Sequence, residues 1–219
     1  MEFLAYALVA LGAYLLGSIP TGYLMARAKG IDIRTVGSGN IGATNAFRVL
    51  GKGPGVFVLL VDAAKGCVAV VLAALAGPLL AGVPSERVNE VSEVFQVIAG
   101  LGAILGHNFT CWLKFKGGKG VATSAGVLLA LLPKALGIAF GAWVVAFALS
   151  RYVSLASITA AVTLPVATWL FGYSRMLTTV SAIIGVLTIY RHRGNIQRLL
   201  AGTENRVGAK KPPEKEGKS

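Results

Sequence analysis

The hydrophobic residues of this chain lie in long continuous blocks, and short polar segments separate the blocks. A helix needs about 20 predominantly apolar residues to cross a bilayer, and fewer where the bilayer is thin. We expect seven blocks to form membrane-spanning helices: 3–25, 54–77, about 92–106, about 121–132, 135–149, 153–172 and 176–190. The pattern therefore predicts an all-α integral membrane protein with about seven transmembrane helices and short glycine-rich cytoplasmic loops.

The composition agrees with one membrane domain followed by a polar tail. Hydrophobic residues make up 55% of the 219 positions and charged residues 14%, against about 25% charged residues in a typical soluble domain. We assign residues 1–200 to a single transmembrane domain and expect 201–219 to be a basic, disordered cytoplasmic tail. No positive charge precedes Arg27, which argues against a cleaved secretory signal.

The positive charges are unevenly distributed over the predicted loops. The net charge is +12, and alternating the seven spans places seventeen Lys and Arg residues on one side, three on the other and Lys65 inside a span. Cytoplasmic loops carry an excess of Lys and Arg, so the richer side is predicted to be cytoplasmic and the N-terminus external. Orientation and contact with anionic lipid explain the basic surplus, and we expect membrane lipid rather than nucleic acid as a partner.

Four polar stretches fall on the predicted cytoplasmic side: "GSGNIGATNAFR" (37–48), "GHNF" with "KFKGGKGVATS" (106–124), "RYVSLAS" (151–157) and "YRHRGNIQR" (190–198). Taken singly, each has an ordinary explanation, such as a turn, a headgroup anchor or a Ser or Thr bonded to its own helix. Together they predict two anion sites. Glycines let backbone N–H groups converge on an anion, Arg48 offers a bidentate donor, and Lys116 and Lys119 precede a predicted helix N-terminus.

The residue types present exclude several other chemistries. No His, Asp and Glu cluster is spaced to hold a metal, no carboxylate pair is available for acid–base catalysis, and Cys67 and Cys111 have no ligand spacing. Gly37, Gly39 and Gly42 match G-x-G-x-x-G, but a dinucleotide site needs a strand before this motif, and here transmembrane segments flank it. The remaining donors are suited to binding anions and stabilising negative charge, without a metal or cofactor.

Two features inside the predicted spans have structural consequences. Asp62 and Lys65 lie one helical turn apart in the second span, where a charge is costly unless it is paired. They form either a mutual structural pair or a contact to the basic site. Gly137 and Gly141 have the G-x-x-x-G spacing and therefore predict close helix packing.

The longer motifs resemble those of a known family. The resemblance rests on "GSIPTGYLMARAKGIDIRTVGSGNIGATNAFR", "GHNF", "KFKGGKGVAT", "RYVSLASI" and "YRHRGNI", from about Gly17 to Arg198. These are similar to the bacterial acyl-phosphate:glycerol-3-phosphate acyltransferases, the PlsY family. The resemblance implies a seven-helix enzyme of the bacterial cytoplasmic (inner) membrane, with a cytoplasmic active site, no metal, and functional coupling to an enzyme that produces acyl phosphate.

The resemblance also implies the reaction and the residues. A fatty acyl group would pass from acyl phosphate to the 1-hydroxyl of glycerol 3-phosphate, giving lysophosphatidic acid and phosphate in the first acylation of phospholipid synthesis. Four residues are expected to be catalytic: Lys119, Ser157, His192 and Asn195. Eleven are expected to bind substrate: Ser38, Gly39, Asn40, Gly42, Thr44, Asn45, Arg48, His107, Lys116, Gly117 and Gly118. Lys119 is the first choice for glycerol 3-phosphate, and His107 would orient a loop or donate to phosphate.

The sequence leaves the proton acceptor and two rival functions open. His192 is a candidate base from its pKa class, and a phosphate oxygen of bound substrate is the alternative, which the scarcity of Asp and Glu favours. A transporter of a phosphorylated solute or anion would also use glycine-rich loops at helix ends, although the predicted external loops are short and poor in donors. A scaffold subunit would tolerate the loss of Arg48 or Lys119.

Overall fold

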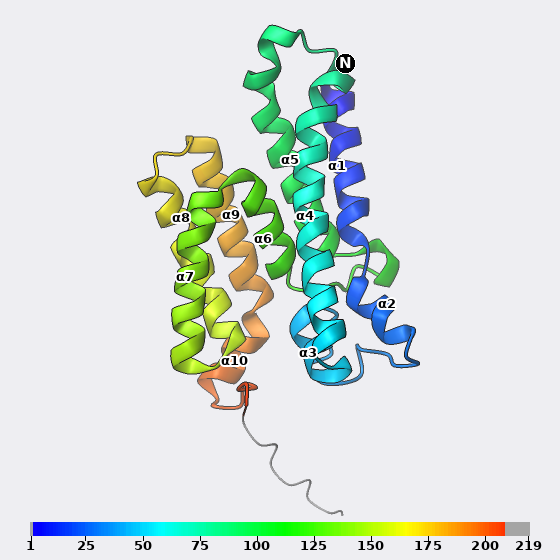
Figure 1. The fold of residues 1–219 in the computed structure, drawn as a ribbon, viewed down its shortest axis with the longest axis vertical. Coiled ribbons are helices and arrows are strands. Elements are labelled where there is room, and N and C mark those ends of the chain that lie inside the picture. Colours follow the sequence, from blue (N-terminus) through cyan, green and yellow to red (C-terminus); the bar gives the residue numbers. More distant parts are fainter. Residues whose placement is uncertain (1, 209–219) are drawn as a thin grey trace, which may run out of the picture.

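The computed structural model describes residues 2–208, and every regular element in that range is helical (Figure 1). The α-helices of this range are α1 (Glu2–Ser18), α2 (Thr21–Arg27), α3 (Ala43–Leu50), α4 (Lys52–Ala81), α5 (Val88–Asn108), α6 (Val121–Leu131), α7 (Pro133–Ser150), α8 (Val153–Leu170), α9 (Arg175–Arg191) and α10 (Arg193–Leu200). Two short 3-10 helices, η1 (Ser85–Arg87) and η2 (Cys111–Leu113), flank α5.

The long helices form two groups that run along the same axis (Figure 1). In the first group α1 packs along α4 and α5, and α6 packs on α4; in the second group α7, α8 and α9 pack in chain order. A continuous apolar core joins α6 to the second group through buried residues that include Val127, Leu132, Leu164 and Ile184. The helix α6 therefore connects the two groups.

The structure confirms an all-helical protein with helices suited to a membrane. Five segments of the described chain are long and apolar enough to span a bilayer: Glu2–Arg27, Lys52–Ala81, Ser85–Leu113, Pro133–Ser150 and Val153–Leu170. The predicted fourth span is the apolar helix α6, of only 11 residues, and the predicted seventh is α9, of 17 residues. The total of seven spanning helices remains a prediction.

The predicted first span, 3–25, is interrupted near its C-terminal end. Helix α1 ends at Ser18 and α2 begins at Thr21, so the helix is interrupted around Pro20. Proline lacks the N–H that a continuing helix requires. Lys65 Nζ donates to the Ile19 carbonyl oxygen at 2.9 Å. The break thus exposes a carbonyl group that a buried lysine uses.

Two short helices occupy segments that we expected to be loops. The second half of the 37–48 stretch is α3, with Gly42 in an extended conformation at its N-terminal cap. The end of the 190–198 stretch lies in α10, which follows α9 directly after His192. Both helices mix polar and apolar residues, and neither lies within a long block of hydrophobic residues, so the hydrophobic pattern alone did not reveal them.

Close helix packing depends on glycines other than the predicted pair. A Cβ atom at Gly66 of α4 would lie 2.3 Å from Thr123 O of α6, and one at Gly126 of α6 would lie 1.8 Å from Ala63 O of α4. The two backbones therefore touch where only glycine fits. By contrast, nothing lies within 4 Å of a Cβ atom placed at Gly137 or Gly141, so the predicted packing of that pair is wrong.

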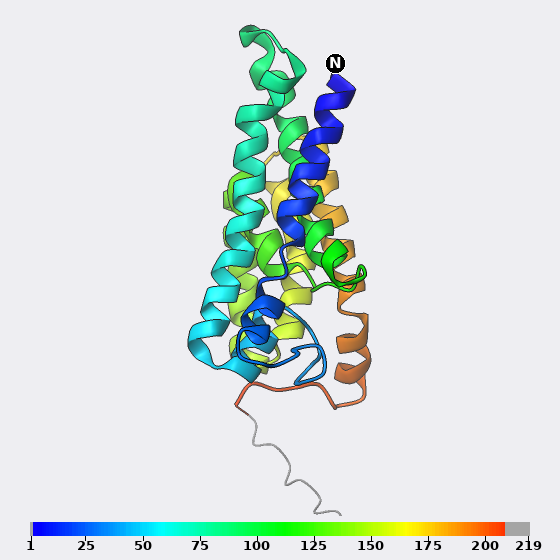
Figure 2. The ribbon, with the colours of Figure 1, turned by 90° about the vertical axis from the view of Figure 1, so that its right-hand side faces the viewer.

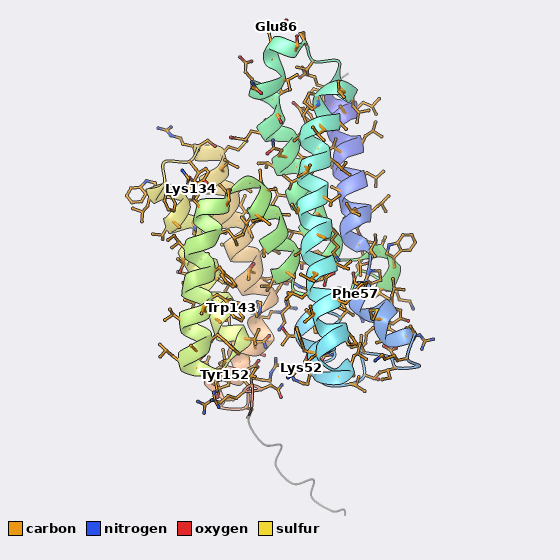
Figure 3. All side chains as sticks on the ribbon, viewed as in Figure 1. Lys52, Phe57, Glu86, Lys134, Trp143 and Tyr152 are labelled. Carbon is orange, nitrogen blue, oxygen red and sulfur yellow. The ribbon has the colours of Figure 1, made fainter. Side chains whose placement is uncertain are left out.

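The polar stretches gather at one end of the bundle, as predicted. Helices α2, α3 and α10 lie at the lower end in Figures 1 and 2, together with the irregular segment between α2 and α3. Figure 3 places Lys52 and Tyr152 at this end and Glu86 at the opposite end.

Residues 201–208 continue along this polar end and contact the α7–α8 corner. Val207 N–H donates to Arg151 O at 3.0 Å, and Arg206 Nε donates to Ser150 O at 3.2 Å. The rest of the predicted tail, 209–219, lies outside the described residues.

Candidate active site

The loop that leads into α3 is held by its own asparagines. The buried Asn45 side chain donates through Nδ2 to Ile33 O at 3.3 Å and to Val36 O at 3.1 Å, and its Oδ1 accepts the Ser38 N–H at 2.8 Å. Asn40 Oδ1 accepts the Gly42 N–H at 2.9 Å. We predicted that Asn45 contacts substrate, but its side-chain amide forms its hydrogen bonds with the backbone of the loop.

The polar groups that remain unpaired among the described residues of this region point to an anion site along the exposed face of α3, from the loop before it to Arg48 in its last turn. Ser38, Thr44 and Arg48 have exposed side chains, and Thr44 and Arg48 are four residues apart, so they share one face of α3. Gly42 provides no side-chain cap, so the first N–H groups of α3 lack an intrahelical partner. Gly37 and Gly39 have φ values of 62° and 67° and allow the loop its tight course.

The N–H groups of the Gly117–Gly118 pair, predicted to face substrate, are bonded within the protein. The Gly117 N–H donates to Asn108 O at 3.2 Å and the Gly118 N–H donates to His107 O at 3.0 Å. A Cβ atom at Gly118 would lie 2.1 Å from His107 Nε2. These glycines therefore allow the loop to pack on the end of α5, and their N–H groups are not free to bind an anion.

The N-terminus of α6, directly after this loop, carries unpaired polar groups. Gly120 is its N-terminal cap, with φ of 78° and no side-chain cap. Within residues 2–208, the buried Asn108 amide and the Thr123 and Ser124 hydroxyls have no hydrogen-bond partner. Asn108 was not among the predicted site residues. The Asn108 amide lies beside Gly120, the residue that follows Lys119, so these polar groups and the first N–H groups of α6 lie close to Lys119.

Lys119 lies at the centre of a network that joins the loop to α10. Its Nζ donates to Asn195 Oδ1, and Asn195 Nδ2 donates to Glu204 Oε1 at 2.6 Å. Ser154 Oγ donates to the same carboxylate oxygen at 3.1 Å, and Arg198 Nε donates to the other oxygen at 2.8 Å. The Glu204 side chain is 7% exposed. Glu204 could not be singled out from the sequence, because it lies in a polar tail with no pattern of its own.

The pKa values of Lys119 and His192 are both lowered. Burial lowers the pKa of Lys119 to about 8 against the opposing effect of Glu204, and the charges of Arg198, Arg191 and Arg48 lower it further. Burial, and then the Lys119 charge, lower the pKa of His192 to about 4. His192 Nδ1 lies 2.8 Å from Thr188 O. The neutral ring therefore donates from Nδ1 and keeps Nε2 as an acceptor.

Ser157 of α8 has structural contacts of its own. Its Oγ donates to Val153 O at 2.8 Å and accepts from Trp143 Nε1 at 3.3 Å; Trp143 is labelled in Figure 3. Ser157 follows Ser154, a ligand of Glu204, by one helical turn and so shares its face of α8. Helix periodicity thus places Ser157 beside the network, one turn further along α8.

A buried charged cluster lies behind the loop, between the first helices of the bundle. Lys65 Nζ is 2.8 Å from Asp62 Oδ1 and 3.1 Å from His107 Nδ1, and Thr21 Oγ1 donates to the same Asp62 oxygen at 3.2 Å. Asp62 and Lys65 are therefore a mutual pair, as the first of our two alternatives predicted. The pair also reaches the site indirectly, because the His107 ring packs under Gly118.

The structure brings the predicted residues together unequally. Lys119, His192 and Asn195 converge, because Lys119 donates to Asn195 and the Asn195 N–H donates to the His192 carbonyl oxygen. Arg48 lies apart from these bonds, in the last turn of α3. The exposed Lys116 side chain shows no contact with this cluster. Asn45, His107, Gly117 and Gly118 support the loops, and Gly39 and Gly42 shape the approach to α3.

Comparison with known proteins gives the family of this chain. Residues 7–202 match a family model described as glycerol-3-phosphate acyltransferase. A glycerol-3-phosphate acyltransferase of Synechococcus sp. (strain JA-3-3Ab) is 49% identical over 95% of this chain and 96% of its own length. One of Thermosynechococcus vestitus is 51% identical over 92% of this chain and 95% of its own length.

A solved structure shares both fold and sequence with this chain. It is the crystal structure of PlsY (YgiH), an integral membrane glycerol 3-phosphate acyltransferase, in the glycerol 3-phosphate form. It has a TM-score of 0.82 and 40% identity, and the match covers 93% of this chain and 96% of that one. The chain thus belongs to the PlsY family of integral membrane glycerol-3-phosphate acyltransferases.

Proposed function

We propose that this chain transfers a fatty acyl group from acyl phosphate to the 1-hydroxyl of glycerol 3-phosphate. The hydroxyl oxygen would attack the acyl carbon, the bond from that carbon to the phosphate oxygen would break, and lysophosphatidic acid and inorganic phosphate would leave. The observation that carries this proposal is the convergence of Lys119, His192 and Asn195, in which Lys119 donates to Asn195 and the Asn195 N–H donates to the His192 carbonyl oxygen.

Two anionic substrates suit the two regions of donors. The exposed side chains of Ser38 in the loop, Thr44 in the first turn of α3 and Arg48 in its last turn would bind the phosphoryl group of the donor. Lys119 and the N-terminus of α6 would bind the phosphate of glycerol 3-phosphate. The relative solved in glycerol 3-phosphate and lysophosphatidic acid forms supports the acceptor and the product.

An acyl phosphate donor fits a site built from donors alone. Acyl phosphate is a mixed anhydride whose leaving group is already good, so the protein needs chiefly to position both substrates and stabilise the developing oxyanion. Positive charge and backbone N–H groups supply both effects. We therefore assign the donor as acyl phosphate, made by a separate enzyme and delivered through the membrane.

The lowered pKa of His192 favours a substrate phosphate as the proton acceptor. A histidine whose pKa lies at about 4 is neutral at pH 7 but is a weak base. Its Nε2 can accept a hydrogen bond from the attacking hydroxyl and orient it, while a phosphate oxygen takes the proton.

The pH dependence of kcat/KM tests these assignments. Lys119 must carry its proton to hold phosphate, so kcat/KM is expected to fall as pH rises through about 8. Arginine keeps its charge throughout this range, so Lys119→Arg should shift the fall to higher pH even if its activity is lower. The measurement is kcat/KM from pH 6 to 10, corrected for spontaneous hydrolysis of the donor; an unchanged alkaline fall in Lys119→Arg contradicts the assignment.

His192→Gln belongs in the same series. If a substrate phosphate accepts the proton, the variant should lose rate but retain the pH dependence of the wild type above pH 6. A new requirement for high pH in His192→Gln would instead assign the proton to His192.

The polar end of the bundle would face the cytoplasm of a bacterial cell, with the N-terminus outside. The excess of Lys and Arg in the segments at this end supports that orientation. Glycerol 3-phosphate would then enter from water, and the acyl chain of the donor would stay in the lipid of the inner membrane.

A donor assay with purified protein tests the function directly. Labelled glycerol 3-phosphate would be supplied with palmitoyl phosphate, palmitoyl-CoA or palmitoyl carrier protein, each separately and without added metal. We expect labelled lysophosphatidic acid from palmitoyl phosphate alone. Product only from a thioester would reject the proposed donor. Uptake of glycerol 3-phosphate into proteoliposomes without product from any donor would favour the transporter.

A further inference from the structure

We propose that Arg191 is a positioning residue that fixes the Gly117–Gly118 loop and thereby sets where Lys119 meets His192 and Asn195. Arg191 is the last residue of α9, so it comes from a different group of helices than the loop. Its Nε donates to Gly118 O at 3.1 Å, and its Nη2 donates to Gly118 O at 2.6 Å and to Gly117 O at 3.2 Å. One guanidinium group thus holds both carbonyl oxygens of the glycine pair.

Both the N–H groups and the carbonyl groups of Gly117 and Gly118 form hydrogen bonds. The end of α5 accepts both N–H groups, through the carbonyl oxygens of Asn108 and His107, and Arg191 donates to both carbonyl groups. With all four backbone groups paired, the peptide planes have little freedom to rotate. Lys119 follows immediately, so the direction of its side chain depends on this pairing.

Arg191 itself is held in place on a second side. Its guanidinium carbon lies 5.0 Å from the centre of the Phe109 ring, a stacking geometry that favours arginine over lysine. The backbone carbonyl of Phe109 accepts from Tyr14 of α1 at 2.7 Å. The contacts of Arg191 therefore connect α9 to the first group of helices, next to the site.

Arg191 can affect catalysis because it lies directly before His192 in the chain. His192 is the next residue, and Asn195, the partner of Lys119, lies in the first turn of α10. Lys119 comes from the α5–α6 loop and must meet these two residues across the interface of the helix groups. A displacement of about 1 Å at a catalytic group can cost about 10²-fold in rate.

The experiment compares Arg191→Ala and Arg191→Lys with Arg193→Ala. Arg193 is the matched control, because it is exposed, lies two residues away, and contacts only the ring and carbonyl oxygen of Tyr190 among the described residues. We expect kcat/KM for glycerol 3-phosphate to fall by about 10²-fold in Arg191→Ala. Arg191→Lys should fall between Arg191→Ala and the wild type, and Arg193→Ala should match the wild type.

Added guanidinium provides a readout that a purely structural residue would not give. Millimolar guanidinium can occupy the space of the deleted group and restore the forked donor, so it should raise kcat/KM of Arg191→Ala and leave Arg193→Ala unchanged. Thermal unfolding in detergent should show a folded Arg191→Ala protein. Loss of activity with a large fall in Tm and no recovery by guanidinium would assign Arg191 to stability alone and overturn the inference.

The inference rests on the proposed role of Lys119, and one further variant separates the two. If Lys119→Ala retains activity, the proposed function of the site fails, whatever Arg191 does. If Lys119→Ala is inactive while Arg191→Ala behaves like Arg193→Ala, the positioning role alone fails. If both variants are impaired and guanidinium rescues only Arg191→Ala, both assignments stand.

Discussion

Lys119→Ala is expected to lower kcat/KM for acyl transfer by about 10²–10³-fold, the range seen when one preorganised donor to a developing charge is removed. The side chain is the cationic centre of the network with Asn195 and Glu204, and it is partly buried, so water screens its charge only weakly. Deletion leaves Asn195 without its charged partner. The measurement is the initial rate of lysophosphatidic acid formation at varied glycerol 3-phosphate.

Lys52→Ala is the matched control for this variant. Lys52 is an exposed lysine at the first position of α4, at the same end of the bundle (Figure 3). It should leave kcat/KM near the wild-type value, because a solvated charge outside the network adds little to binding. Equal losses in the two variants would indicate a general effect of surface charge and would count against Lys119 as a specific ligand.

Asp62→Asn is expected to destabilise the fold by about 3–5 kcal/mol, the cost of leaving one charge of a buried pair without its partner. Asp62 is 1% exposed and Lys65 is 5% exposed, in the middle of a helix surrounded by apolar residues. The remaining Lys65 would keep only the Ile19 carbonyl and His107 as polar partners. Thermal unfolding of the detergent-solubilised protein measures the loss.

Two companion variants make the Asp62 result specific. Asp62→Asn combined with Lys65→Met removes both charges and should be less destabilising than Asp62→Asn alone, since no buried charge remains unpaired. Asp32→Asn removes the carboxylate of an exposed pair with Arg34 at 2.6 Å and should hardly change Tm. A double variant less stable than Asp62→Asn would mean that Lys65 stabilises the protein through Ile19 and His107 rather than through Asp62.

The sequence pointed to the residue types of the candidate site, because the chemistry of a side chain does not depend on the fold. Lys119, His192 and Asn195 lie in polar stretches that interrupt apolar blocks, and their side chains can do little else but bind anions or exchange hydrogen bonds. The individual roles were harder to predict. Gly117 and Gly118 have the composition of an anion-binding loop, yet their N–H groups pair with the end of α5. A glycine permits an unusual backbone conformation, but the segments packed around it determine which atom accepts the hydrogen bond from its N–H.

The sequence did not identify residues whose contacts are with partners far away in the chain. Arg191 is one of several arginines in its stretch, and only the packing of α9 against the loop distinguishes it from Arg193. Glu204 lies in a polar segment, and its carboxylate becomes a partner of Asn195 because the chain turns back after α10.

The sequence by itself determined that this chain is a helical membrane protein with its polar chemistry at one end. Insertion of a segment into a bilayer depends on how many apolar side chains follow one another along the chain, and this information is contained entirely in the sequence. Only the tertiary structure decided that Gly66 and Gly126 form a close crossing while Gly137 and Gly141 do not, and which donors remain free for substrate. Those outcomes depend on distances of a few ångströms between segments far apart in the chain, which local patterns do not encode.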